Sequence, residues 1–293
     1  MITTILDGKS VAARISEKTR EITMKLPRKP GLAILLVGDN AASHKYVELK
    51  EQAAEQCGVR IVKQVFPAAT DITTLLRVIS EWNITTDIDA ILVQLPLPEP
   101  LNLYTNDVIL QMDPSKDVDG FHPTNIDRFS KLMTRKEAQG HTPVLVQAVM
   151  ELLDETRIAL HHKRAVILGK SDVFLRPLAH GLSLMGLDPV LAGSDPAAPL
   201  AAALLQRADV VVTAIGKAGI LTSNSLRESA VVIDIGQTPK SGRLSGDFDV
   251  STAEGRVRFY TPVPGGVGPV TVAAMIHAVA VRCQNTLRAL GRA

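Results

Sequence analysis

The stretch "YVELKEQ" places a phenol and a primary amine one helical turn apart, because Tyr46 precedes Lys50 by four residues. Lys50 stands beside the apolar face of the helix expected here. That face is formed by Tyr46, Leu49, Ala53 and Cys57. A lysine so placed can extend its ammonium along an apolar surface into water. The helix alone favours that interpretation, so a chemical role for the amine needs support from the rest of the chain.

The segment "TPVPGGVGP" supplies a second candidate site. Pro264, Gly265 and Gly266 offer backbone groups that no side chain obscures. They stand just ahead of an expected helix N-terminus, where backbone N–H groups point outward. Taken alone, the segment is only a stiff turn.

Alternating strands and helices are expected to position these residues. Apolar runs predict strands at 31–39, 59–66 and 89–100, the last of which ends in prolines that cannot continue a sheet. Apolar periodicity predicts helices at 43–57 and 72–82. This alternation predicts an α/β fold with a parallel sheet covered on both faces.

A second domain is expected after an irregular, polar stretch at 111–140. A helix at 143–155 is followed by four apolar strand patterns, "RAVILG", "DPVLAG", "ADVVVTAIG" and "SAVVIDIG". This half reads as a small doubly wound domain, and a long apolar-faced helix closes the chain.

Composition excludes several classes of protein. The 293 residues suffice for roughly two domains, and 46% hydrophobic with 3% aromatic residues favours an α/β protein. A net charge of +2 without a basic stripe argues against a nucleic-acid partner. Cys57 and Cys283 stand apart in apolar patterns, so we expect buried thiols and neither a disulfide nor a metal site. The start of the chain does not resemble a signal peptide, and no apolar run approaches membrane-spanning length. We therefore expect a soluble, cytoplasmic protein without a membrane partner.

Several motifs together resemble one family over nearly the whole chain, in the same order. They are "LDGK", "GLAILLVGDNAAS", "ILVQLPLP", "DPSKDVDGFHPTN" and "TPVPGGVGPVTVA". The family is the bifunctional methylenetetrahydrofolate dehydrogenase/methenyltetrahydrofolate cyclohydrolase. Its members oxidise 5,10-methylenetetrahydrofolate with NAD(P) and hydrolyse the methenyl product to 10-formyltetrahydrofolate.

The resemblance implies two α/β domains with the active site in the cleft between them. The folate-binding catalytic domain would comprise 1–139 and 269–293, and a Rossmann-like NAD(P)-binding domain would comprise 140–268. It further implies tetrahydrofolate one-carbon derivatives as partners, a homodimer, and a place in one-carbon metabolism and purine biosynthesis.

The resemblance also assigns catalytic and folate-binding residues. Lys50 matches the family's catalytic lysine, which a cationic substrate and burial would keep neutral and able to accept a proton. Tyr46 would pack on the folate, and Gln94 would hydrogen-bond the lysine. Asp119 matches the carboxylate that accepts paired N–H bonds from the pterin, although an Asp before Gly is also a common turn. Asp117 reads as structural, and the loop of Pro264, Gly265 and Gly266 touches the folate in the family.

The nucleotide-binding motifs depart from the family pattern. The phosphate loop reads "GKSDVFLRP", with Leu175 where a glycine is usual, and a leucine side chain there would crowd the phosphates. Asp195 replaces an arginine that favours NADP; it would bind the ribose hydroxyl of NAD, or equally serve as a turn or helix cap. His141 replaces a cysteine and is expected on the surface or in a cleft. The residues expected to bind NADP or NAD are Gly169, Lys170, Ser171, Asp195, Thr213, Gly216 and Gln237.

Three hypotheses follow from these departures. The first is a bifunctional enzyme that binds NAD or NADP, with Asp195 favouring NAD. The second is a cyclohydrolase alone, with the nucleotide domain as a scaffold. The third is a folate-binding protein without catalysis, against which the full set of catalytic side chains argues. An NAD-binding module without folate is less consistent still, because the specific motifs lie outside the dinucleotide half.

Overall fold

The computed structural model describes residues 2–240 and 242–291, which divide into two compact units. Unit 1 comprises Met1–Ala12 and Leu132–Thr271, and unit 2 comprises Ala13–Lys131 and Val272–Ala293. This division differs from the expected domains at the N-terminus, since strand β1 (Thr4–Ile5) pairs in parallel with β11 (Phe259–Tyr260) of unit 1. The division passes through two long helices, α1 (Gly8–Thr23) and α10 (Val267–Ala289).

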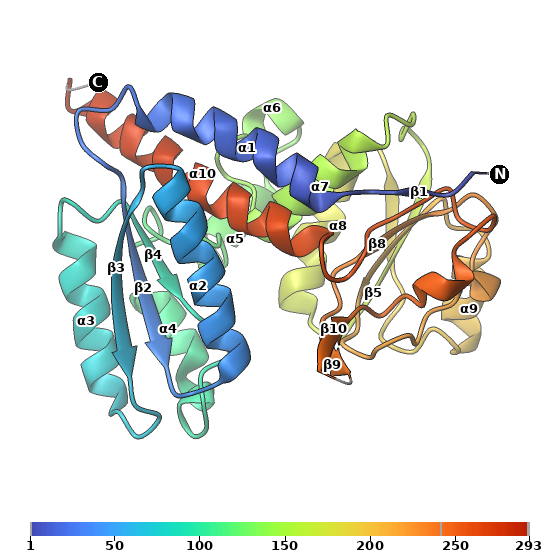
Figure 1. The fold of residues 1–293 in the computed structure, drawn as a ribbon, viewed down its shortest axis with the longest axis horizontal. Coiled ribbons are helices and arrows are strands. Elements are labelled where there is room, and N and C mark those ends of the chain that lie inside the picture. Colours follow the sequence, from blue (N-terminus) through green and yellow to red (C-terminus); the bar gives the residue numbers. More distant parts are fainter. Residues whose placement is uncertain (1, 241, 292–293) are drawn as a thin grey trace. The chain divides into compact units, whose positions relative to one another are not determined.

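Unit 2 is built on a three-stranded parallel sheet in the order β3-β2-β4 (Figure 1). The strands are β2 (Gly31–Val37), β3 (Arg60–Phe66) and β4 (Ala90–Val93). One face packs on α3 (Ile72–Ile84) and α4 (Thr105–Gln111), which follows the short 3₁₀ turn Leu101–Tyr104. Every residue of β2 is buried, as expected for a central strand covered on both faces.

Helix α2 (Ala41–Gln56) connects β2 to β3 and has well-defined ends. The Asn40 side chain accepts a hydrogen bond from the backbone N–H of Ser43, which caps the first turn. The helix ends at Cys57, and Gly58 follows with φ +69°, a left-handed conformation that suits glycine. The predicted helix at 43–57 is therefore confirmed, two residues longer at its start.

The polar stretch at 111–140 contains the boundary between the two units, at Lys131/Leu132, and two short helices that the sequence did not predict. It contains α5 (Pro123–Ser130) and α6 (Arg135–Ala138). The backbone N–H of Thr124 donates to His122 Nδ1 ahead of α5. Thr134 and Glu137 form a reciprocal capping box at α6. These helices are short and polar, so local capping rather than apolar periodicity marks them.

Unit 1 contains a six-stranded parallel sheet in the order β1-β11-β8-β7-β5-β6 (Figure 1). The four predicted strand patterns correspond to β5 (Arg164–Gly169), β6 (Asp188–Leu191), β7 (Val210–Ala214) and β8 (Val231–Asp234). Its helices include α6 and also α7 (Val144–Glu155), α8 (Asp172–Leu184) and α9 (Pro199–Leu205), with 3₁₀ turns at Ser223–Ser225 and Val250–Thr252. Strands β9 (Thr238–Lys240) and β10 (Arg243–Ser245) form an antiparallel pair. Two α/β units with parallel sheets confirm the predicted fold class.

Helix α10 is long and apolar enough, by length and composition, to cross a membrane, which the sequence analysis did not anticipate. Half of its most apolar window is nevertheless buried inside the structure. The core helix of a protein that never meets a membrane has the same properties, so α10 is weak evidence for a span. The buried side chains of α10 include Ala274, Ile276, Val279 and Cys283.

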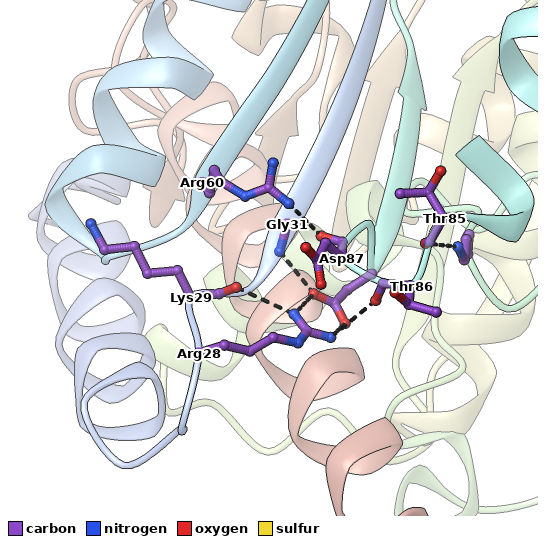
Figure 2. A network of polar contacts seen from close by, with 9 residues as sticks. Arg28, Lys29, Gly31, Arg60, Thr85, Thr86 and Asp87 are labelled. Atoms are coloured by element: carbon purple, nitrogen blue, oxygen red, sulfur yellow. Dashed lines mark hydrogen bonds and ion pairs between the residues drawn. The ribbon is translucent and has the colours of Figure 1, made fainter. Parts of the chain in front are cut away.

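A charged network closes the amino-terminal ends of β2 and β4 (Figure 2). Both terminal nitrogens of Arg28 donate to the Asp89 carboxylate at 2.7 Å, and the Gly31 N–H donates to it at 2.8 Å. The Asp89 side chain is only 2% exposed. Arg28 is therefore the counter-charge of a buried acid. Burial and the Asp89 carboxylate also raise the pKa of the neighbouring Cys283 thiol to about 12.

Replacing Arg28 with methionine is expected to lower the free energy of unfolding by about 3–5 kcal/mol, since it leaves a buried carboxylate without its partner. Urea denaturation measures the change. Arg77→Met is the matched control, because within the part of the chain that the structure describes Arg77 pairs only with Glu81, on the exposed face of α3. Its effect should stay within about 0.5 kcal/mol. Equal effects of the two substitutions would contradict the role given to Arg28.

Candidate active site

Lys50 lies in the buried stripe of α2, which differs from the predicted apolar face. That stripe consists of Ser43, Val47, Lys50 and Ala54, continued by Cys57. Leu49, expected to be buried, is 42% exposed, and Lys50 is only 8% exposed. The interpretation in which Lys50 extends into water was therefore wrong.

Gln94 is the hydrogen-bond partner of Lys50. The lysine Nζ donates to Gln94 Oε1 at 2.8 Å. Gln94 directly follows β4, and its backbone N–H donates to Leu35 O, which continues the ladder to β2 by one residue. Its Nε2 donates to Leu95 O at 2.8 Å, which directs Oε1 towards the lysine. A neutral acceptor satisfies the buried amine without adding a negative charge that would stabilise its protonated form.

Burial lowers the pKa of the Lys50 amine, and the negative charge of Asp119 partly opposes this effect. Tyr46 lies one turn earlier on α2 and is half-buried, which raises the pKa of its phenol. Within the described residues the Tyr46 hydroxyl makes no hydrogen bond, so it remains available to a ligand. Unit 2 thus combines a buried amine with reduced basicity and a phenol on the same helix.

Asp117 has the structural role that the sequence predicted, whereas the pterin-binding role of Asp119 stays a prediction. Asp117 is buried and accepts hydrogen bonds from the N–H groups of Gly120 and His122 and from Asn125 Nδ2. Asp119 is half-buried and accepts no hydrogen bond from any residue that the structure describes. Burial raises the pKa of the Asp119 carboxyl to about 6, an effect that Lys50 partly offsets. Asp117 therefore holds the loop together and leaves Asp119 free to accept donors from a ligand.

A small pocket in unit 1 brings together two groups of predicted site residues. It is lined by Gln237, expected to bind the cofactor, and by Pro264, Gly265 and Gly266, expected to bind the substrate. The remaining lining residues are Asp234, Leu244, Pro262, Val263, Val267 and Gly268. Gly8 of "LDGK" packs against this loop so closely that a Cβ would lie 1.8 Å from Gly266 O. A Cβ at Gly266 would itself lie 2.6 Å from Pro262 O, so the conformation of this loop depends on glycine at both 8 and 266.

The predicted phosphate loop follows β5 at the carboxyl end of the sheet. Gly169 ends the strand and its N–H donates to Gly193 O, while Lys170 and Ser171 are exposed just before α8. Leu175 is buried and packs against the loop itself, since its Cδ2 lies 2.8 Å from where a Gly169 Cβ would stand. Crowding of the phosphates by Leu175 stays a prediction.

Two other predicted cofactor residues take part in local structure. Asp195 is exposed and accepts a hydrogen bond from the Ala197 N–H, which confirms the turn interpretation and leaves its role towards a ribose a prediction. Thr213 is fully buried and its Oγ1 donates to Asp247 Oδ2 at 2.8 Å. The assignment of the Thr213 side chain to cofactor binding was therefore wrong, because the hydroxyl faces the protein interior.

Asp247 was missed by the sequence analysis and organises the loop after β7. Besides Thr213, it accepts hydrogen bonds from the backbone N–H groups of Ile215, Gly216 and Lys217 at 2.6–2.9 Å. Gly216 has φ +75°, and a Cβ there would meet nothing within 4 Å, so this loop borders open space. The motif "SGDFDV" contains no periodicity that identifies Asp247 as a buried acceptor.

Asp234 is a second buried acid that the sequence analysis missed, at the carboxyl end of β8 and on the wall of the unit 1 pocket. It accepts hydrogen bonds from the N–H groups of Gly236 and Phe248, both at 2.8 Å. Burial raises the pKa of this carboxyl to about 7. The sequence could have identified Asp234, because this acidic residue ends a buried strand in "VVIDIG" and ligands bind at the carboxyl ends of parallel strands.

The chemistry of unit 1 suits a dinucleotide. The loops after β5 and β7 stand at the carboxyl end of a parallel sheet, where such ligands bind. Lys170 supplies an exposed cation, and Gly216 leaves room for close approach to the backbone. The Thr238 hydroxyl, directly after Gln237, is buried without a hydrogen-bond partner among the described residues, and such groups commonly await a ligand or water. Within the described ranges no group of His, Cys, Asp or Glu side chains could hold a metal ion, and His141 is exposed.

Comparison with known proteins gives consistent matches across both halves of the chain. A family model described as the catalytic domain of tetrahydrofolate dehydrogenase/cyclohydrolase matches residues 6–119. The model of the NAD(P)-binding domain of the same proteins matches residues 143–287.

Individual relatives match over nearly their full length. The bifunctional protein FolD of Methanospirillum hungatei is 39% identical over 96% of this chain and 98% of its own, and that of Pediococcus pentosaceus is 37% identical over 93% and 95%. Among solved structures, Campylobacter jejuni FolD has a TM-score of 0.88 at 32% identity, covering 97% of this chain and all of its own. Trypanosoma brucei FolD, complexed with NADP and an inhibitor, has a TM-score of 0.90 at 31% identity, covering 98% and 99%.

Proposed function

The chain belongs to the tetrahydrofolate dehydrogenase/cyclohydrolase family, and from this premise we propose that it catalyses two consecutive reactions on a one-carbon unit. The first oxidises 5,10-methylenetetrahydrofolate to 5,10-methenyltetrahydrofolate with a nicotinamide cofactor. The second hydrolyses the methenyl compound to 10-formyltetrahydrofolate. The enzyme is thus both an oxidoreductase and a hydrolase.

The buried Lys50 amine, bonded to Gln94, is the observation that carries the hydrolytic step. Water forms a bond to the cationic methenyl carbon, and neutral Lys50 accepts the proton that this water loses. The remaining hydroxyl then loses its proton as the carbon–oxygen double bond forms and the carbon–N5 bond breaks. N5 takes up one proton, the formyl group stays on N10, and the proton held by Lys50 is released to water. Burial favours the neutral amine, and a nearby cationic substrate favours it further, so Lys50 is suited to act as a general base.

Binding of the folate is assigned to Asp119 and Tyr46. The Asp119 carboxylate is unoccupied by protein donors within the described residues and can accept two N–H groups of the pterin. Tyr46 offers a half-buried ring and a free hydroxyl one turn before Lys50 on α2. Contact between folate and the loop of Pro264, Gly265 and Gly266, which the resemblance implies, stays a prediction.

The NAD(P)-binding domain fits its cofactor through Gly169, Lys170, Ser171, Gly216 and Gln237. The cofactor, when bound, accepts the hydride from the methylene carbon. Because hydride transfer depends mainly on close alignment, the role of these residues is to hold and orient. Asp195 is exposed after β6, where a carboxylate favours the ribose hydroxyl of NAD over the phosphate of NADP. We propose NAD as the preferred cofactor on this basis.

We expect purified protein to accelerate methenyl hydrolysis above the rate in buffer and to reduce a nicotinamide cofactor with methylenetetrahydrofolate. Absorbance measurements follow both reactions, and separate assays with NAD and NADP compare kcat/KM. Hydrolysis without reduction of either cofactor would leave a cyclohydrolase alone. Folate binding with neither reaction would reject the proposal.

We propose that the protein is a homodimer, as the resemblance to its family implies, and that it acts in the cytoplasm. Light scattering after size-exclusion chromatography should then give about twice the chain mass of 31.4 kDa. A mass of one chain across the accessible concentration range would reject the dimer. Fluorescence microscopy of the tagged chain in its source cell would test the compartment.

A further inference from the structure

Arg282 of α10 contacts the loop that carries Asp119 across a sequence separation of more than 160 residues. Its Nε donates to Ser115 O at 3.2 Å, and its Nη2 donates to Asp117 O at 2.8 Å. Both acceptors are backbone carbonyls, and among the described residues no carboxylate forms an ion pair with the guanidinium. The planar fork of arginine can bind two carbonyls at once, which the single ammonium of lysine cannot reproduce.

The positive charge of Arg282 also acts on Asp119. The charged groups that influence the Asp119 carboxyl are Lys50 on α2, Asp117 in its own loop and Arg282 on α10. The two cations lower the pKa of Asp119, while burial and Asp117 raise it. Arginine remains charged across the pH range in which proteins are stable, although burial lowers the pKa of Arg282. Lys50, by contrast, is the cation that must lose its proton to act as a base.

We propose that Arg282 is a positioning residue of the pterin site, which fixes the Asp119 loop and keeps Asp119 ionised when Lys50 is neutral. This inference rests on the proposed role of Asp119 in binding folate. A carboxylate accepts both pterin N–H groups, whereas a protonated carboxyl group has lost part of that capacity. With Lys50 neutral, Arg282 is the permanent positive charge among the groups acting on Asp119, so ionisation of the acid and basicity of the amine can coexist.

Calorimetric measurement of the Kd of tetrahydrofolate between about pH 5 and pH 8, under anaerobic conditions, tests this proposal. In the unaltered protein, binding should weaken as pH falls through about 6, the pKa of Asp119. Arg282→Met should move this midpoint upward by roughly half to one pH unit, because an opposing cation is lost. It should also weaken binding at high pH, where Asp119 is ionised, because the loop has lost the hydrogen bonds from Arg282 to its two carbonyls.

Variants separate charge from structure. Arg282→Lys keeps the positive charge, so it should restore the midpoint but not the full affinity at high pH. If Arg282→Met fails to fold, the lysine variant still tests the proposal. Arg288→Met removes a charge from the exposed last turn of the same helix and should leave the midpoint unchanged. Asp119→Asn should remove the pH dependence, and adding Arg282→Met to it should not restore one.

An unchanged midpoint in folded Arg282→Met would overturn the inference. So would weakening that is uniform across pH, which indicates a purely structural arginine. These outcomes are distinct from failure of the proposed function, because that failure shows as absent methenyl hydrolysis and absent folate binding in the unaltered protein.

Discussion

Replacing Lys50 with methionine is expected to lower kcat for methenyl hydrolysis by about 100- to 10,000-fold, the range typical of a lost general base. Methionine fills a similar volume and suits the buried stripe of α2, so the variant should fold. Hydrolysis by the unaltered enzyme should increase with pH as Lys50 loses its proton. Since burial lowers the pKa of this amine, the increase should be complete at a lower pH than for an exposed lysine.

Lys45→Met is the matched control for this substitution. Lys45 lies on the same helix, is exposed, and among the described residues pairs only with Glu48 one turn later. Its replacement should change kcat by less than about twofold, corresponding to surface effects within 0.5 kcal/mol. The base assignment fails if Lys50→Met retains kcat within tenfold of the unaltered enzyme, measured as the loss of methenyl absorbance after subtraction of the buffer rate.

The second large effect is expected in unit 1. Asp247→Ala should lower the free energy of unfolding by about 4–12 kcal/mol, because four donors lose a buried acceptor at about 1–3 kcal/mol each. A loss of that size approaches the whole stability of many domains. Asp247→Asn provides the measurable variant, since it keeps one acceptor oxygen and should lose about half as much. Urea denaturation followed by circular dichroism gives both values.

Asp249→Asn tests whether location rather than residue type matters at Asp247. The Asp249 side chain accepts only from the N–H and hydroxyl of Ser251, in a turn near the surface. Asparagine caps such a turn nearly as well as aspartate, so the substitution should change stability by less than about 1 kcal/mol. Similar losses from Asp247→Asn and Asp249→Asn would contradict the role of Asp247 in holding the loop at Gly216.

The sequence allowed most of the regular fold to be predicted because apolar periodicity marks buried elements. Strand β2 and helix α3 are clear examples, with continuous and periodic apolar residues respectively. Helix α6 was missed because it lacks apolar periodicity, although "TRKE" satisfies the capping-box pattern. The buried stripe of α2 was misplaced for a related reason: it uses Ser43 and Ala54, whereas the bulkier Leu49 is exposed.

The site was predictable only where neighbouring residues carry the information. Lys50 and Gln94 were found through motifs, and the structure places them in hydrogen-bond contact. Arg282 and Asp247 were not found, because each acts on a segment distant in sequence. No local pattern predicts that a helical arginine near the end of the chain binds carbonyls 165 and 167 residues earlier. Such contacts depend on tertiary packing, which composition and periodicity do not encode.

The two thiols provide an internal reporter of local opening. Cys57 and Cys283 are both buried and both belong to unit 2. Since the thiolate is the reactive species and burial raises the pKa of both groups, alkylating reagents reach them only when this unit opens. The rate of thiol labelling therefore measures local opening of unit 2, which contains Lys50, without a contribution from unit 1.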